Sequence, residues 1–485
     1  MAIVSIGRRL TDLAEADPDR PSLTCDGHTI TRAEVESKAN RLARAYAGLG
    51  VVQGDLVTIA LPNSIEFYLA CFAIWKLGAT PQPVSSRLPL AEREAIVELA
   101  DSRLIVGVDS HPTRVSLPAG YQPPADLDDS PLPDVISPSL KAPTSGGSTG
   151  RPKLILSGDP GVVDVEAGPT LMQKVDGCEV VAGPLYHNGP FIFSMGAFFH
   201  GNHLVVESHF DAVDTLRLIE QHAVDWIFLV PTMMHRIWRL DPAVRDSFDL
   251  SSLVVMLHLA APCPPWLKQN WIEWLGPERI FELYAGTEAQ AATWITGTEW
   301  LEHRGSVGRP LVGEMKILGP DGEELAPGEV GEVWMRSPPT RERPTYEYRG
   351  AEARRREGGW ESLGDLGSMD ADGYLYLSDR RVDLILAGGA NIYPAEVEAA
   401  LEEHPGVLGS VVIGLPDDDL GQRVHAIVHV ADVGAPPSEA SLRAFLDTRL
   451  VRYKVPRTFE FVDSLLRDDA GKVRRSALRD ARIGS

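Results

Sequence analysis

Apolar runs that alternate with helix-like segments are the feature that most restricts how this chain can fold. Four such runs occupy residues 178–182, 203–207, 226–230 and 253–257. Short apolar strands separated by helices are typical of a mainly parallel sheet covered by helices. Before residue 110 the same alternation recurs, and IEFYLACFAIWKL (65–77) is apolar on nearly all sides, which predicts a buried helix. We therefore expect an α/β fold.

The pattern changes twice along the chain. Residues 116–143 are rich in Pro, Asp and Ser and predict an irregular connection. Between 305 and 378, short alternating segments are separated by the turn signals 319–322 and 370–373, which predicts a small β subdomain.

A compact α+β unit is expected after Arg380. Its predicted elements are a helix from Pro394 to about Glu403, strands over 407–415 and 424–431, a helix starting at Ser438, and a strand over 458–463. A chain of 485 residues exceeds one ordinary core. We predict a large N-terminal domain, 1–380, and a small C-terminal domain, 381–485.

Composition narrows the class of protein. The chain is 44% hydrophobic, and its longest apolar stretch is too short to span a bilayer. We see no secretory signal and expect a cytoplasmic protein without a membrane span. The net charge of −22 argues against nucleic acid as a partner. Four cysteines without CxxC spacing, and histidines without an HExxH pair, predict reduced thiols and no structural metal.

Residues 144–153, TSGGSTGRPK, have a composition suited to wrapping a polyphosphate. Glycines let the backbone approach an anion, and successive N–H groups form a concave nest of donors. The residues expected to contact phosphate are Thr144, Ser145, Gly146, Gly147, Ser148, Thr149, Gly150 and Lys153. A flexible Ser/Gly linker is the alternative, but Lys153 and the apolar run after it favour a loop anchored to a strand. The segment is not a Walker loop, because its lysine follows Arg151 and Pro152 instead of opening a helix.

This loop resembles the signature of the adenylate-forming superfamily, which includes acyl-CoA synthetases, peptide-synthetase adenylation domains and luciferases. Further segments match that family in order: AGPLYHNGP (182–190), LHLAAP (257–262), ELYAGTE (282–288), GWESLGDLGSMDADGYLYLSDRRVD (359–383), AGGANIYPAE (387–396) and LRDDAGKVRR (466–475). The resemblance implies ATP, Mg²⁺ and coenzyme A as cofactors. It also implies a mobile C-terminal domain that rotates about Arg381 and Val382 between two half-reactions.

The resemblance assigns a nucleotide site. Ala260, Ala261 and Pro262 are expected along the adenine ring, Tyr284 stacked on it, and Asp365 and Arg380 on the ribose. Thr287 is expected at the α-phosphate and Glu288 at Mg²⁺. The remaining expected contacts are Glu282, Leu283, Ala285 and Gly286.

The resemblance also assigns groups to the acid and the thiol. Lys472 would bridge the substrate carboxylate and the α-phosphate, and His187 would gate the thiol channel. Gly388 and Gly389 would let pantetheine pass close to the backbone, although a plain turn is equally consistent with that segment. The expected acyl pocket contains Tyr186, His187, Asn188, Phe191, Trp226, Leu259, Ala260 and Gly286.

We therefore expect an acyl-CoA synthetase for a hydrophobic acid, such as a bulky cyclic, terpenoid- or steroid-like acid or an aryl acid. The partners are then the acid or its adenylate, and CoA. Alternatives are an enzyme that only converts a preformed acyl-adenylate to a thioester, a stand-alone enzyme serving a carrier protein, a ligase making amides and, least favoured, a non-catalytic adenylate-binding protein. The first is raised by departures from the family pattern: an extra Gly147, Ala285 for glycine, Val382 at the hinge and Leu466 for proline.

Overall fold

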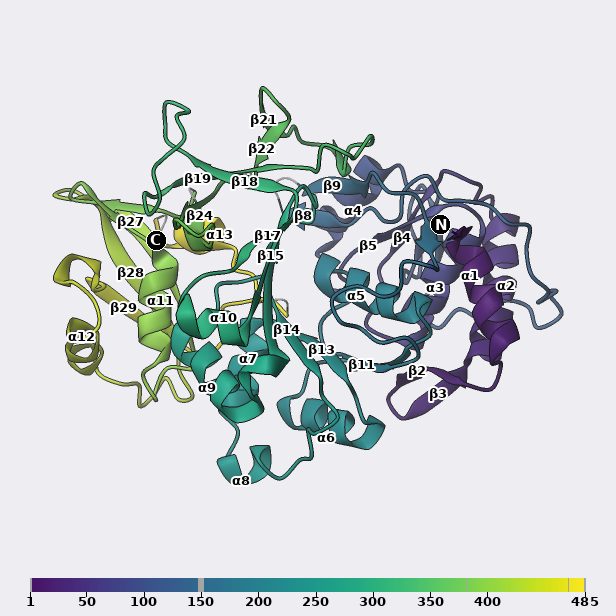
Figure 1. The fold of residues 1–485 in the computed structure, drawn as a ribbon, viewed down its shortest axis with the longest axis horizontal. Coiled ribbons are helices and arrows are strands. Elements are labelled where there is room, and N and C mark those ends of the chain that lie inside the picture. Colours follow the sequence, from purple (N-terminus) through teal and green to yellow (C-terminus); the bar gives the residue numbers. More distant parts are fainter. Residues whose placement is uncertain (1, 147–151, 381, 470, 484–485) are drawn as a thin grey trace.

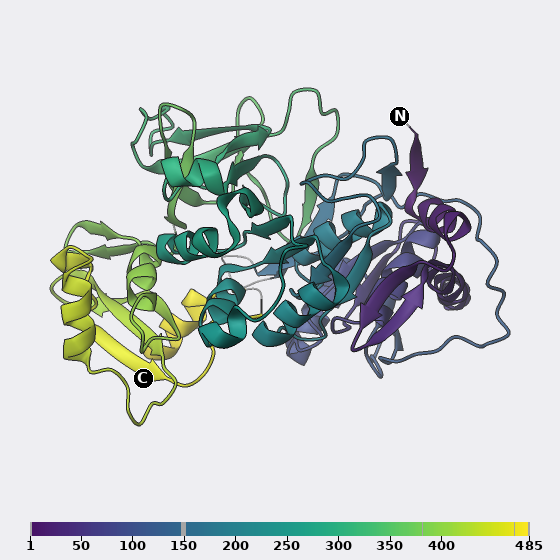
Figure 2. The same ribbon diagram turned by 60° about the horizontal axis from the view of Figure 1, so that its bottom comes forward.

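The structure is a computed structural model that describes residues 2–146, 152–380, 382–469 and 471–483. Its N-terminal strands and helices lie at one end of the molecule and the C-terminal unit at the other, with the wide central sheet between them (Figure 1). The strands of residues 314–380 form a separate layer above that sheet (Figures 1 and 2). The α/β class is confirmed.

The central sheet is mainly parallel, as expected. Strands from β15 to β2 pair in parallel, whereas β16, β17 and β3 add antiparallel edges. The spatial order is β17 (Arg309–Val312), β16 (Ala292–Thr296), β15 (Ile280–Ala285), β14 (Val255–His258), β13 (Trp226–Leu229), β11 (Cys178–Val181), β12 (His203–Val206), β2 (Pro21–Cys25) and β3 (His28–Thr31). Four of these were predicted; β14 begins two residues later than expected, at Val255.

A second parallel sheet is built from the N-terminal segment. Its order is β5 (Thr80–Pro83), β4 (Leu56–Ile59), β6 (Leu104–Val106) and β7 (Val115–Leu117). The predicted helix is α3 (Ile65–Lys76), whose residues from Phe67 to Lys76 are all buried. It packs against α1 (Ile6–Ala16) and α2 (Arg32–Gly48), which explains why its sequence is apolar on every side.

The other helices of the N-terminal part follow strands of the two parallel sheets. They are α4 (Leu90–Ala100), α5 (Asn188–Phe199), α6 (Ala212–His222), α7 (Pro231–Trp238), α8 (Pro242–Arg245), α9 (Pro265–Leu275) and α10 (Gly297–Glu302). A short pair joins β1 (Ile3–Ser5) to β10 (Val162–Asp164). No described helix is both long enough and apolar enough to cross a bilayer.

The predicted β subdomain is present. Its strands are β18 (Glu314–Leu318), β19 (Gly331–Arg336), β21 (Arg354–Arg356), β22 (Trp360–Ser362), β23 (Asp365–Met369) and β24 (Leu375–Arg380). Strand β20 (Tyr346–Arg349) leaves this layer and pairs with β9 (Pro152–Ser157), which pairs in turn with β8 (Thr144–Gly146). This pairing ties the phosphate-loop strands to the β subdomain.

The C-terminal unit has its own hydrophobic clusters, built from residues between Ile385 and Leu478. A sheet in the order β27 (Gly409–Asp417), β28 (Gly421–His429) and β29 (Thr458–Val462) packs against α11 (Pro394–Glu402) and α13 (Arg475–Ile483). Helix α12 (Glu439–Asp447) begins after Ser438, whose side chain accepts from the N–H of Ser441. These elements agree with the prediction, and a hairpin of β25 (Ile385–Ala387) and β26 (Ala390–Ile392) precedes them.

Candidate functional site

The phosphate-loop segment is anchored between strands, as predicted. Strand β8 pairs with β9 so that Thr144 is opposite Leu154 and Ser145 opposite Lys153. The predicted contacts Gly147, Ser148, Thr149 and Gly150 lie outside the described residues. The strands β8 and β9, on either side of these residues, are therefore paired with each other.

Lys153 points into a group of polar side chains from three distant segments. Its Nζ lies 3.2 Å from Glu288 Oε1 and 2.9 Å from the hydroxyl of Tyr348, and that hydroxyl donates to the same Glu288 oxygen. Glu288 is 5% exposed. Burial and the Glu288 carboxylate raise the pKa of Tyr348 far above its ordinary value, so Tyr348 stays protonated. The group thus offers one cation and one carboxylate.

The end of β15 brings the predicted adenine and ribose residues together. The hydroxyl of Tyr284 donates to Asp365 Oδ2 at 2.7 Å. Asp365 on β23 is directly opposite Arg380 on β24, so the two residues predicted to contact the ribose are cross-strand neighbours. At Gly286 a Cβ would lie 2.3 Å from Leu363 Cδ1, so this site admits only glycine without movement.

The segment after β14 is open and strained. Ala260 and Pro262 are exposed, and Leu259 and Ala261 are half-buried. Ala260 has φ of +81°, a left-handed conformation that residues with a Cβ rarely adopt. Strain of this kind is concentrated at functional sites, which agrees with a backbone that lies along a ligand. Ala285, by contrast, is not among the residues with positive φ, so alanine is tolerated there without backbone strain.

Glu282 lies below this surface. Its carboxylate is buried and forms an ion pair with Lys268 Nζ at 2.6 Å. Burial raises the pKa of Glu282, and Lys268 opposes that shift. The side chain of Glu282 therefore supports β15 from inside the fold, although it was predicted as a cofactor contact.

The His187 loop is held by hydrogen bonds of the half-buried side chain of Asn63. Asn63 donates to the carbonyls of Gly183 and Glu207, and its own amide oxygen accepts from the N–H of Leu185. Burial, with a second contribution from Lys472, lowers the pKa of His187 to about 3, so the ring is neutral. Its Nε2 is buried and has no hydrogen-bond partner among the described residues.

A buried lysine lies directly behind this loop. Lys141 is 8% exposed, and its Nζ donates to the side-chain oxygen of Asn188, the first residue of α5. Burial lowers the pKa of Lys141 to about 8. The region expected to bind a hydrophobic acid therefore has a buried lysine next to the predicted pocket residue Asn188.

The Lys472 segment contacts the N-terminal domain at the His187 loop. His187 Nε2 lies 3.9 Å from Asp468 Oδ2, and a Cβ on Gly471 would lie 3.2 Å from the hydroxyl of Thr232. At the rim, Arg474 pairs with Glu92 at 3.1 Å. The structure thus places Lys472 beside the groups predicted to hold the acid.

A cationic contact also joins the two domains. Arg239, the residue after α7, donates to the carbonyl oxygens of His404, Pro405 and Val407, at 3.3, 3.2 and 2.6 Å. These carbonyls follow the C-terminal end of α11, where cations are stabilising. Arg239 also donates to His235 Nε2 at 2.9 Å.

Two predicted acyl-pocket residues are core residues instead. Phe191 is 1% exposed and packs edge-on against Phe67 and Trp75. Trp226 is 1% exposed and stands at the first residue of β13, whereas the other site residues lie at strand carboxyl ends. Both side chains therefore lie in the core of the described structure, because an apolar run does not reveal which end or face of its element meets a ligand.

Gly388 and Gly389 form the two-residue turn between β25 and β26. Both have positive φ, +57° and +80°, which a tight hairpin of this length requires. The turn alternative is therefore correct locally. The arginines of β21 are mostly paired within the β subdomain: Arg354 pairs with Glu332, and Arg355 with Glu361 at 2.8 Å.

Sequence reasoning missed Tyr348 and Lys141. Tyr348 reaches the site only because β20 pairs with β9, and the local sequence YEYR carries no sign of that pairing. Lys141 had a usable signal, since it is one of nine lysines and stands three residues before the phosphate loop. Burial of that lysine follows only from the fold.

The donor set fits a metal ion that is shared with phosphate. No cluster of three or more His, Cys, Asp or Glu side chains suited to a metal occurs in the parts of the chain that are described. Magnesium needs only one or two protein carboxylates when phosphates supply the other ligands. Glu288, held next to Lys153, is such a carboxylate.

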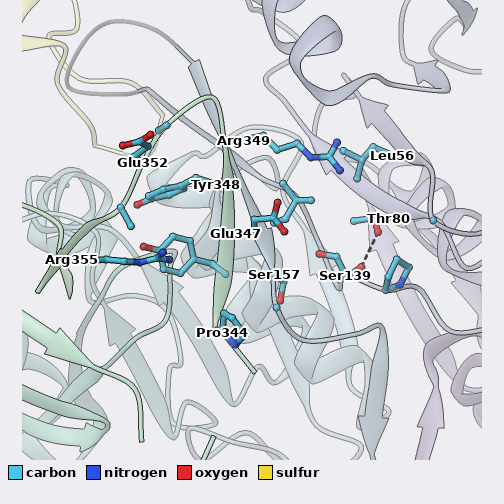
Figure 3. A pocket seen from close by; sticks show the side chains of 17 residues that line it. Leu56, Thr80, Ser139, Ser157, Pro344, Glu347, Tyr348, Arg349, Glu352 and Arg355 are labelled. Atoms are coloured by element: carbon cyan, nitrogen blue, oxygen red, sulfur yellow. Dashed lines mark hydrogen bonds between the residues drawn. The ribbon is translucent and has the colours of Figure 1, made fainter. Parts of the chain in front are cut away.

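A cavity of about 760 Å³ opens beside β20, between that strand and the segment of Thr80 and Ser139 (Figure 3). Its lining carries charges of both signs, from Glu347, Arg349, Glu352 and Arg355. No residue predicted for the nucleotide or the acid lines it. The cavity therefore borders the site through Tyr348 but is separate from it.

Comparison with known proteins agrees with this geometry. The model of the AMP-binding enzyme family matches residues 10–341, and that of the AMP-binding enzyme C-terminal domain matches residues 396–472. A fatty acid–[acyl-carrier-protein] ligase, ScoC, of Streptomyces coeruleorubidus is 30% identical over 96% of this chain and 94% of its own length. A feruloyl-CoA synthase of an Amycolatopsis species is 31% identical over 96% of each chain.

A solved structure has the same fold over its whole length. The o-succinylbenzoate CoA synthetase of Bacillus subtilis, in complex with its acyl-adenylate intermediate, superposes with a TM-score of 0.82 at 26% identity and covers 100% of both chains. The chain therefore belongs to the AMP-binding enzyme family, within the adenylate-forming superfamily, and groups with its AMP-forming acid–CoA ligases.

Proposed function

We propose that this enzyme is an acyl-CoA synthetase that joins a hydrophobic carboxylic acid to coenzyme A through an acyl-adenylate. The observation that carries the proposal is the convergence of distant segments. Lys153, Glu288 and Tyr348 form one group, Tyr284 and Asp365 a second, and the Lys472 segment meets His187 across the domain boundary. ATP, Mg²⁺ and CoA are the cofactors of such a ligase.

In the first half-reaction, a carboxylate oxygen of the acid attacks the α-phosphorus of ATP. A C–O–P bond forms, the bond to the β-phosphate oxygen breaks, and pyrophosphate leaves. Lys153 would balance charge on the leaving group, and Lys472 would balance it at the reacting phosphorus. Asp365 and Tyr284 would orient the ribose and the base. The other contribution of the protein to this step would be to hold the carboxylate and the α-phosphate close together in a reactive orientation.

Glu288 would hold Mg²⁺ at the phosphates. When bound, the ion supplies charge neutralisation to the phosphate oxygens. The Tyr348 hydroxyl donates to the Glu288 carboxylate, and Lys153 pairs with the same oxygen at 3.2 Å, so both side chains orient this carboxylate.

In the second half-reaction, the sulfur of CoA attacks the acyl carbon. A C–S bond forms and AMP leaves with the electrons of the broken mixed-anhydride bond. We propose that the domain after Arg380 rotates about Val382 for this step; Val382 is 64% exposed, which suits a hinge. The Gly388–Gly389 turn would then approach pantetheine.

The acid is proposed to be bulky and mainly hydrophobic, of an aryl, terpenoid or steroid type. Leu259, Ala260 and Gly286 follow strands β14 and β15 and have small or apolar side chains, which suit contact with an apolar ring system. The similarity to a feruloyl-CoA synthase supports an aryl acid. The similarity to a carrier-protein ligase keeps that acceptor as the second candidate.

The test measures each half-reaction separately. A panel of short aliphatic, long-chain, cinnamate-type and steroid-type acids is scored for pyrophosphate release and then for thioester yield with CoA or a holo-carrier protein. Lys472→Ala is expected to lower pyrophosphate release by ~10²–10³-fold, because it removes a preorganised cation. It should leave thioester formation from supplied acyl-adenylate nearly unchanged.

Lys454→Ala is the matched control. Lys454 is another lysine of the C-terminal domain, and it pairs with Glu396 at 2.6 Å, away from the Lys472 turn. Equal loss of both half-reactions in Lys472→Ala would contradict its assignment. Thioester formation without pyrophosphate release from any free acid would favour the enzyme that uses a preformed adenylate.

A further inference from the structure

Arginines on both sides of Lys472 reach the same buried carboxylate. Glu398, on α11, is 4% exposed. Arg467 donates to its Oε2 at 2.8 Å, and Arg475 donates to Oε1 at 2.7 Å and Oε2 at 2.9 Å. The backbone N–H of Val412 supplies a further bond at 2.8 Å. Glu398 therefore binds the start and the end of the segment that carries Lys472.

Arg467 continues this contact into the turn itself. Its second amino group donates to the carbonyl of Gly471 at 3.3 Å, next to Lys472. The backbone N–H of Lys472 donates to Asp468 Oδ1 at 2.8 Å, and its carbonyl accepts from the N–H of Asp468 at 2.9 Å. Asp468 thus holds the Lys472 backbone, and Arg467 links the adjacent Gly471 carbonyl to Glu398.

The same network reaches the domain boundary. Arg475 also pairs with Asp383 at 3.3 Å, and Asp383 follows the predicted hinge residue Val382. One carboxylate and two arginines therefore connect the hinge exit, α11 and the Lys472 turn. This network therefore ties the turn that carries Lys472 to α11 and to the residue after the predicted hinge.

The ionised form of Glu398 is required by this arrangement. Burial opposes ionisation, but Arg475 and Arg467 outweigh it and lower the pKa of Glu398. A neutral Glu398 side chain would weaken the binding of both guanidiniums, and Arg475 would keep its pair with Asp383.

We propose that Glu398 is a positioning residue of the first half-reaction, which holds the Lys472 turn in register with the acid and the α-phosphate through Arg467 and Arg475. The inference rests on the proposed role of Lys472 in adenylate formation. In the second half-reaction Lys472 has no proposed task, so disturbing its support should leave that step intact.

The experiment compares Glu398→Gln with Lys472→Ala in the full chain, using pyrophosphate release and thioester formation from supplied acyl-adenylate. Glutamine keeps the shape of Glu398 and removes its charge. Because a displacement of about 1 Å can cost ~10²-fold, we expect pyrophosphate release to fall ~10–100-fold. Thioester formation should stay within about twofold, with the KM for ATP little changed.

The matched control is Glu460→Gln. Glu460 accepts two bonds of 2.6 Å from Arg482 on α13, so it forms a comparable carboxylate–guanidinium pair in the same domain without contacting the Lys472 turn. This control should leave both half-reactions unchanged. A merely stabilising role of Glu398 would lower both half-reactions together.

The outcomes are separable. If Lys472→Ala shows the split and Glu398→Gln shows equal or no loss in the two steps, the positioning role is refuted. If Lys472→Ala shows no split, the proposed function of Lys472 fails instead. If Glu398→Gln does not fold, Arg467→Met is the second test, because it removes the bond to the Gly471 carbonyl and leaves the Glu398–Arg475 pair. Arg467→Met must then lower pyrophosphate release and leave thioester formation unchanged, or the positioning role is refuted.

Discussion

Arg239→Gln should shift the balance between the two domain orientations. The side chain makes three bonds to carbonyl oxygens of the C-terminal domain. Hydrogen bonds that involve a charged group contribute about 1.5–3 kcal/mol when buried. The contact is at a partly exposed boundary, and a released arginine regains water. We therefore expect a loss of about 1–2 kcal/mol of docking free energy, which corresponds to a roughly 5–30-fold lower population of the described orientation.

The assay is again the pair of half-reactions. The described orientation places the Lys472 turn against the His187 loop, the proposed acyl site. Pyrophosphate release should therefore fall by up to about tenfold, whereas thioester formation from supplied acyl-adenylate should be unchanged or faster. Fluorescence energy transfer between dyes on the two domains should report the shift directly. Arg217→Gln is the control, since Arg217 donates to Asp214 and Gln221, which lie near it on α6 in the N-terminal part.

The reasoning would be refuted by a variant that changes both half-reactions equally, or by unchanged energy transfer together with unchanged pyrophosphate release. In either case Arg239 would contribute to packing and not to the choice of orientation.

Two further predictions concern stability. Ala260→Gly should raise the free energy of unfolding by about 0.5–1 kcal/mol, because glycine relieves the backbone strain at φ +81° and only part of that gain is lost through the greater freedom of the unfolded chain. Denaturant titration measures this change, with Ala261→Gly as the control because the φ of Ala261 is not positive. A lower free energy of unfolding in Ala260→Gly would contradict the prediction. His235 has a pKa lowered to about 4 by burial and then by Arg239, against about 6.5 in the unfolded chain. Between these values the unfolded state binds more protons, so the free energy of unfolding falls as pH drops from 6.5 towards 4, by about 2 kcal/mol at pH 5. His235→Gln should remove that part of the acid sensitivity in titrations at pH 7 and 5, and an unchanged difference between the two pH values would disprove the cause.

Local patterns predicted the elements well. The all-apolar 65–77 segment is a buried helix, Ser438 caps α12, and the apolar runs are parallel strands, because each pattern reflects burial of that same segment. The predicted site residues that could be placed, such as Tyr284 with Asp365, follow from the order of family motifs. What local patterns could not predict are contacts made by pairing at long range, such as Tyr348 with Lys153.

Local patterns also could not predict in which direction each side chain points. Phe191 and Glu282 each stand in a segment that reaches the site, but one packs on Phe67 and the other pairs with Lys268. A strand or helix near a ligand presents only some of its residues to it, and the choice depends on what covers the opposite face. That covering comes from residues far away in the sequence.

The pairing of β9 with β20 also has a consequence for how the chain is made. Ser157 is opposite Tyr346, so one edge of β9 stays uncovered on the ribosome until the β subdomain has been synthesised. Uncovered strand edges invite pairing with other chains. Nascent chains that stall before residue 346 should therefore be prone to aggregate, and added nucleotide should protect them little.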